Sequence, residues 1–166
     1  MSKKIVLKSV LAVVVVGFIL SMSSCQKEEK KIIGVWKYEK MEVTDFACSD
    51  PVVTAMAKPI VQQYIGFGAA LMSGIEIEFT KEGTVITRSL YGNGVATYKV
   101  NGSTLTITDN GSVTSSEISF PNKKTLCITE DADRADLEGF SETLQEDLGI
   151  EVQVVKLRTA MTLTKK

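Results

Sequence analysis

Between Ile75 and Thr129 the chain runs through short segments in which apolar and polar residues alternate, and a turn signal ends each segment. Strict alternation places every second side chain on one buried face of a strand. Asn-Gly pairs at 101–102 and 110–111 are typical of tight antiparallel hairpins. The stretch therefore predicts six strands of an up-and-down meander, over 75–79, 84–90, 95–100, 105–108, 113–120 and 126–129.

Two longer β-rich segments flank the meander, at 32–43 and 150–164. The second changes its apolar parity near Val154, which predicts a bulge or a bend there. A long last strand that pairs back to the first removes the free edges of such a sheet. We therefore predict a mostly β protein, an eight-stranded antiparallel up-and-down β-barrel.

A helical insertion is predicted after strand one. Ser49-Asp50-Pro51 is a helix start, and apolar residues recur at helical spacing from Val53 to Leu71. Pro59 predicts a kink in this helix or two short helices. By its place in the chain the insertion is either a mobile lid over the barrel mouth, similar in layout to the portal of fatty-acid-binding proteins, or a static plug of one barrel end.

A second helix is predicted before the last strand, with apolar residues at helical spacing from Leu137 to Leu148 and a C-cap at Gly149. Its start is acidic, at Asp131, Asp133, Asp136 and Glu138. These carboxylates raise a calcium hypothesis, but the glycine and the distant glutamate of an EF-hand loop are not in place. Helix capping explains them better, and no metal site is predicted.

Residues 1–24 read as a targeting segment, with a basic start and an apolar run at 10–20 that is short for a membrane span. Met22-Ser23-Ser24-Cys25 resembles the lipobox of bacterial lipoproteins, which implies a lipid on Cys25; an uncleaved anchor or an ordinary secretory signal is the alternative. Residues 25–31 are then the lipidated cysteine and a flexible, solvated tether. Residues 26–31 also resemble the surface-export signal of Bacteroidetes lipoproteins, although a plain linker explains them too. The location implied is the outer membrane, facing either the periplasm or the cell surface.

Gly34-x-Trp36 opens the first strand and resembles the lipocalin signature, in which the tryptophan closes one end of the barrel. Together with the meander and the lipobox, it makes residues 32–166 similar to the lipocalin-like lipoproteins of the Bacteroidetes type. The resemblance implies a barrel that holds a small apolar ligand.

Catalytic signatures are missing from the sequence, which has no histidine, no nucleophile elbow, no C-x-x-C pair and no phosphate loop. We predict no enzyme activity and no cofactor, and the net charge of −1 gives no case for nucleic acid. In an exported chain Cys48 and Cys127 are predicted to form a disulfide, with two separate buried thiols as the alternative.

Two function hypotheses follow: a membrane-anchored barrel that binds a small apolar ligand, and an interaction or structural module with a solid barrel. An apolar pocket of about 300 Å³ or more would favour the ligand, and a filled core would favour the module. The candidate ligand-binding residues are Trp36, Tyr38, Ile60, Tyr64, Phe67, Leu71, Ile77, Phe79, Tyr98 and Ile107.

Overall fold

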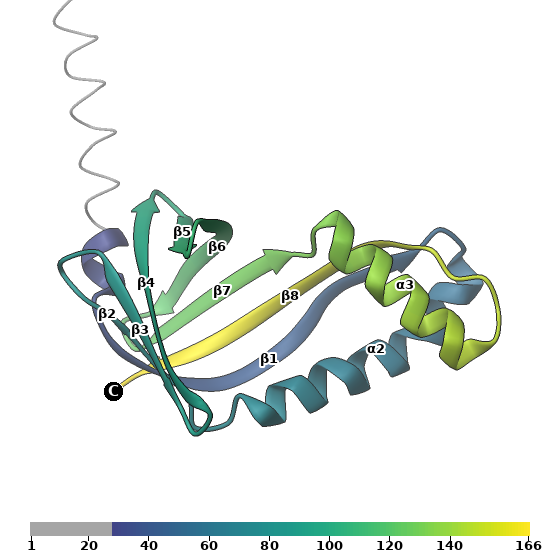
Figure 1. Cartoon of the computed structure of the whole chain (residues 1–166), viewed down its shortest axis with the longest axis horizontal. Coiled ribbons are helices and arrows are strands. Elements are labelled where there is room, and N and C mark those ends of the chain that lie inside the picture. The colour runs from purple at the N-terminus through teal and green to yellow at the C-terminus, as the bar shows by residue number, and fades with distance from the viewer. Residues whose placement is uncertain (1–27) are drawn as a thin grey trace, which may run out of the picture.

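The structure, a computed structural model, describes residues 28–166 as one barrel with two long helices beside it and a helical turn at 28–32 (Figure 1). Its strands are β1 (Gly34–Cys48), β2 (Glu76–Phe79), β3 (Thr84–Ser89), β4 (Gly92–Asn101), β5 (Thr104–Asp109), β6 (Ser112–Asn122), β7 (Thr125–Asp131) and β8 (Val154–Lys165). Each strand pairs antiparallel with the next, and β8 pairs with β1 to close the barrel. The predicted fold class is confirmed, with a helix after the first strand and another before the last.

The first and last strands are the longest and extend beyond the barrel as a two-stranded ribbon (Figure 1). Their register shifts three times, and at the third shift Cys48 pairs with Val154 while Ala47 pairs with Lys156. Val155 is the extra residue, so the bulge predicted near Val154 is confirmed. The bulges keep the apolar side chains of the ribbon on its inner face.

One end of the barrel is closed by a short helix at 28–32 and by Trp36. Ile32 and Trp36 are both fully buried, and the indole Nε1 donates to the carbonyl oxygen of Ile32 at 2.6 Å. Residues 28–31, predicted to be part of a flexible tether, are helical in the structure and lead into the buried Ile32. Cys25, residues 26–27 and the targeting segment lie outside the described residues.

Opposite this closed end lies an open end, where the β3–β4 and β5–β6 hairpins turn at 89–92 and 109–112. The barrel interior holds the first hydrophobic core. Its buried members are Ile32, Trp36, Ile77, Phe79, Val85, Tyr98, Leu105, Ile118, Leu126, Ile128 and Leu163.

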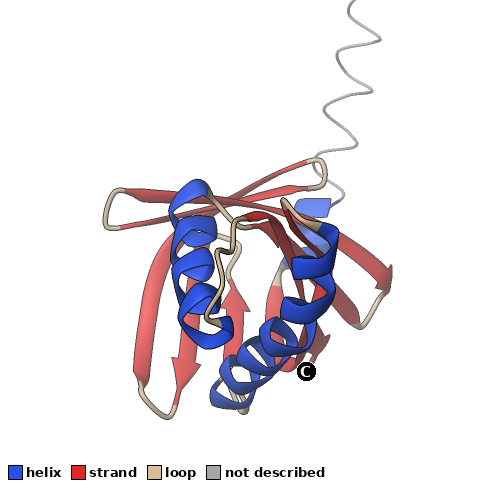
Figure 2. Ribbon diagram, turned by 90° about the vertical axis from the view of Figure 1, so that its right-hand side faces the viewer, coloured by secondary structure: helices blue, strands red, loops and turns tan. Residues whose placement is uncertain are grey.

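A second core lies under the ribbon, where the two helices α2 (Pro51–Leu71) and α3 (Arg134–Leu148) pack against it (Figures 1 and 2). Its buried members are Phe46, Cys48, Ala57, Val61, Leu144, Val152, Val154 and Leu157. α2 runs as one helix through Pro59, so the alternative of two short helices is wrong. Within residues 28–166 no helix has the length and apolar character needed to cross a membrane.

The helix ends follow the capping signals in the sequence. The Asp50 carboxylate accepts from the amides of Val52 and Val53, and Asp133 accepts from the amide of Asp136. Gly149 ends α3 in the left-handed region with φ of 65°. The capping interpretation of the acidic segment is therefore confirmed for Asp133.

Candidate functional site

A cavity of about 230 Å³ occupies the half of the barrel nearest the open end. Its walls come from inward-facing positions on seven strands, where alternation directs every second side chain inside. The apolar lining includes Ile77, Phe79, Val85, Ala96, Ile107, Ile128 and Met161. Four polar residues complete the lining near the mouth of the cavity: Thr87, Asp109, Ser116 and Glu130.

One hydrogen bond joins two residues of this polar rim. The hydroxyl of Ser116, which is almost fully buried, donates to the Glu130 carboxylate at 2.5 Å. The Asp109 carboxylate is solvent-exposed at the end of β5. A molecule in the cavity would therefore meet apolar walls below and two carboxylates at the entrance.

Below the cavity the barrel is filled. The ring of Phe79 meets that of Tyr98 edge to face at 5.0 Å, and the Tyr98 hydroxyl donates to the carbonyl of Thr80 at 2.7 Å. Burial raises the pKa of Tyr98 above its ordinary value. Trp36 packs against Phe120 at 6.1 Å, deeper toward the closed end. Within residues 28–166 the cavity inside the barrel therefore lies in the half nearest the open end.

The structure divides the predicted ligand-binding residues into three groups. Ile77, Phe79 and Ile107 line the cavity as expected. Trp36, Tyr38 and Tyr98 belong to the packed core or its border and do not line it. The four residues from α2 lie outside the barrel, as described next.

The α2 residues face away from the barrel cavity. Ile60, Tyr64 and Phe67 line a groove of about 600 Å³ between α2 and α3, and Phe67 is 69% exposed. Leu71 is 50% exposed. The Tyr64 hydroxyl donates to the Asp147 carboxylate at 2.6 Å, which raises the pKa of Tyr64.

No residue of α2 lines the barrel cavity, so the lid alternative, with Ile60, Tyr64, Phe67 and Leu71 as ligand-binding residues, is wrong. The plug alternative is wrong as well, because α2 packs along β1 and buries Ala57 and Val61 in the second core. Ala57 and Val61 are fully buried on this face, whereas Tyr64, Phe67 and Leu71 are each at least 41% exposed.

The predicted disulfide is also wrong, because Cys48 and Cys127 are both free. On the common neighbour β8, Cys48 lies opposite Val154 and Cys127 opposite Thr162. Eight residues of strand span about 26 Å, whereas a disulfide requires Cα atoms within about 7 Å. Burial in the second core raises the pKa of the Cys48 thiol.

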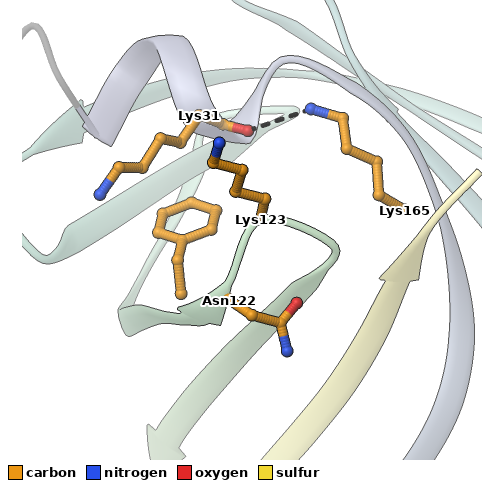
Figure 3. Close-up of a pocket in the computed structure, with 5 residues that line it drawn as sticks. Lys31, Asn122, Lys123 and Lys165 are labelled. Carbon is orange, nitrogen blue, oxygen red and sulfur yellow. Dashed lines mark hydrogen bonds between the residues drawn. The ribbon is translucent and has the colours of Figure 1, made fainter.

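A further hollow, a cleft of about 460 Å³ that was not predicted from the sequence, lies at the closed end. Its lining is Lys31, Phe120, Asn122, Lys123 and Lys165, four of which are labelled in Figure 3. The Lys31 ammonium lies 5.5 Å from the centre of the Phe120 ring, and that of Lys165 lies 5.1 Å from Trp36. The sequence does contain lysine pairs at three distant positions, which could have indicated this cleft. They come together only when the barrel closes.

Residues 28–166 contain no group of three or more Cys, Asp or Glu side chains placed to hold a metal ion. The fold and its hollows define a closed eight-stranded antiparallel barrel with a small cavity at one end. Comparison with known proteins found no match among family models, curated proteins or solved structures.

Proposed function

We propose that this chain is a lipid-anchored envelope protein whose barrel binds one small ligand with an apolar body and a hydrogen-bond-donating head. The observation that carries the proposal is the cavity of about 230 Å³ inside the barrel. Its apolar walls favour an apolar body. The carboxylates of Asp109 and Glu130 at the mouth accept hydrogen bonds, so they favour an amine or a hydroxyl.

The cavity size limits the ligand. At about 230 Å³ it falls below the roughly 300 Å³ set above as the volume that favours a drug-sized ligand. It is nevertheless larger than the engineered 150 Å³ cavity that binds benzene. A long-chain fatty acid therefore does not suit this site. A single ring with a short polar substituent does.

The test uses toluene and benzylamine as probes, with binding followed by ligand-observed NMR. Ile107→Trp should fill the cavity and abolish binding of both probes, whereas Thr106→Trp, on the outer face of the same strand, should leave it unchanged. Glu130→Gln should weaken benzylamine about five-fold or more, because a charge-assisted hydrogen bond contributes more than about 1 kcal/mol. Wild-type protein that binds neither probe, or unchanged binding by Ile107→Trp, would overturn the proposal.

The anchor is proposed from the lipobox resemblance around Cys25, and the outer membrane as location follows from it. Cys25→Ala should abolish incorporation of a radiolabelled fatty acid, because the two other cysteines lie within the folded barrel domain. Cys48→Ala is the matched control and should keep the label. Undiminished label on Cys25→Ala would refute the anchor.

A second candidate function is protein interaction through the outer face of α2. Four apolar side chains share this face, because the spacings between them are close to whole turns of the helix. They are Val52, Met56, Phe67 and Leu71, each about half exposed or more. Exposed apolar surface in one contiguous stripe is typical of interaction sites. Phe67→Glu should abolish any specific complex without changing the barrel, and a complex that survives this change would exclude the α2 face.

A further inference from the structure

We infer that the closed end of the barrel is a docking surface for anionic lipid headgroups, so that the protein stands upright on the membrane beside its anchor. The inference rests on the lipid anchor proposed above and adds the surface that the domain turns toward the bilayer. Three observations carry it: a cluster of lysines, the position at which the described chain begins, and the opposite charge of the far end.

The lysines come from three segments that the closed barrel brings together, and we call them the basic patch. Its members are Lys30, Lys31, Lys123, Lys124, Lys165 and Lys166. The first two lie on the helix at 28–32, the next two in the β6–β7 turn, and the last two at the end of β8. Figure 3 shows three of them, Lys31, Lys123 and Lys165, grouped around the cleft.

Acidic side chains neutralise only part of this patch. Lys31 pairs with Glu28 at 2.7 Å and Lys166 with Glu76 at 2.8 Å. Lys123 and Lys124 are exposed and form no ion pair with any residue of the described chain. The patch therefore has an excess of positive charge, and its cleft of about 460 Å³ has room for a headgroup beside Phe120.

The described chain begins within this patch, at Glu28. Cys25 precedes Glu28 by three residues, and a fully extended chain spans at most about 3.6 Å per residue, or roughly 11 Å here. A lipid on Cys25 would thus hold this edge of the patch at a distance from the headgroups comparable to the Debye length, which is about 8–10 Å at physiological salt. At that distance lysines attract an anionic surface.

The far end of the molecule carries the opposite charge. α3 has five acidic residues, Asp136, Glu138, Glu142, Glu146 and Asp147, against the single basic residue Arg134. Figure 1 places α3 at the end of the molecule opposite the start of the described chain. An anionic membrane attracts the basic patch and repels α3, so both forces turn the closed end toward the bilayer.

The experiment measures vesicle binding by the basic patch in a protein that lacks the lipid anchor. All eight strands and both cores are built from residues 28–166, so the chain from residue 25 onward with Cys25→Ser keeps the described fold. Vesicles of neutral phosphatidylcholine, with or without phosphatidylglycerol, carry a dansyl-labelled lipid. Energy transfer from Trp36, the single tryptophan, reports binding.

We expect binding to the anionic vesicles, little binding to the neutral ones, and loss of binding at high salt. Lys123→Glu should weaken binding at least about five-fold, the effect of one basic residue near an anionic surface. Lys58→Glu is the control, because Lys58 is exposed on α2, has no ion pair in the described chain, and gives the same change in net charge. It should leave binding unchanged.

Equal binding to neutral and anionic vesicles, or equal loss in the Lys58 and Lys123 variants, would overturn the inference. Competition by inorganic phosphate at millimolar concentration would also overturn it, since it would identify a free anion as the ligand. The anchor is tested separately by fatty-acid labelling of the full chain. Failure of vesicle binding by a protein whose full chain takes up the label at Cys25 removes only the docking surface. A wild-type chain that takes up no label removes the anchor, and with it the premise of the docking geometry.

Discussion

Phe79 and Phe67 offer a matched pair of substitutions that tests where the interior of this protein lies. Phe79 is 1% exposed, forms the floor of the cavity and packs edge to face on Tyr98. Phe67 is 69% exposed on α2. Truncation to alanine removes the same atoms from both, so any difference in stability reports the difference in burial.

Phe79→Ala should lower the free energy of unfolding by about 3–5 kcal/mol, from lost burial and from the enlarged cavity. The broken contact with Tyr98 accounts for about 0.5–1.5 kcal/mol of this loss. With a urea dependence of about 2 kcal/mol/M, the midpoint should fall by roughly 1.5–2.5 M. Phe67→Ala should stay within about 0.5 kcal/mol of the wild type.

The assay is urea unfolding followed by Trp36 fluorescence and by circular dichroism, with coincident transitions as the check on two-state behaviour. Comparable losses in the two variants would refute the reasoning, because they would mean that Phe67 is also buried. A loss below about 1 kcal/mol for Phe79→Ala would show that the closed half of the barrel is not packed around this ring.

Three further predictions concern the thiols, a helix cap and an ion pair. Cys48 and Cys127 should both react with a thiol reagent after unfolding of protein kept oxidising throughout; an intact mass two daltons lower, restored by reduction, would contradict this. Asp133→Ala should cost about 1 kcal/mol in urea unfolding, since it removes the N-cap of α3, and no loss would contradict the capping role. The hydrogen bond from Lys166 lowers the pKa of Glu76, so this pair stabilises the fold above the unfolded pKa of glutamate and the contribution is lost as the pH falls through the lowered value. Lys166→Gln should return the Glu76 pKa toward its ordinary value in an NMR titration, and an unchanged pKa would refute the assignment.

The barrel could be predicted from the sequence because alternation and turn signals are local. In each strand of the meander, the alternation of apolar and polar residues shows which face is buried. In β7, for example, Leu126 and Ile128 are buried, whereas Cys127 between them is less buried. Alternation does not show, however, where along the barrel axis a residue lies. The disulfide prediction failed for that reason, since Cys127 and Cys48 lie at opposite ends of β8.

The helix α2 could not be oriented from its pattern, because its only charged residue is Lys58 and apolar side chains occur around most of its circumference. Several stripes fit the helical period, and the buried one carries Ala57 and Val61, whereas the larger residues suggested another face. The basic patch was not predicted either, since its lysines lie in three segments that meet only when the barrel closes. Three residues of the cavity lining could be predicted for the opposite reason: Ile77, Phe79 and Ile107 each follow the alternation of their own strand.

The pairing of β1 with β8 joins the first strand of the barrel to the last and runs through both cores. Neither core is complete without it, so the barrel and the helical end should unfold as one cooperative unit, with hydrogen-exchange protection shared between them. Its contacts are also the most distant in sequence, because Trp36 lies opposite Lys165. Loop closure over such a separation is slow compared with hairpin formation. Folding should therefore show an early meander and a late closure step, because β8 must pair with β1 before either core can form.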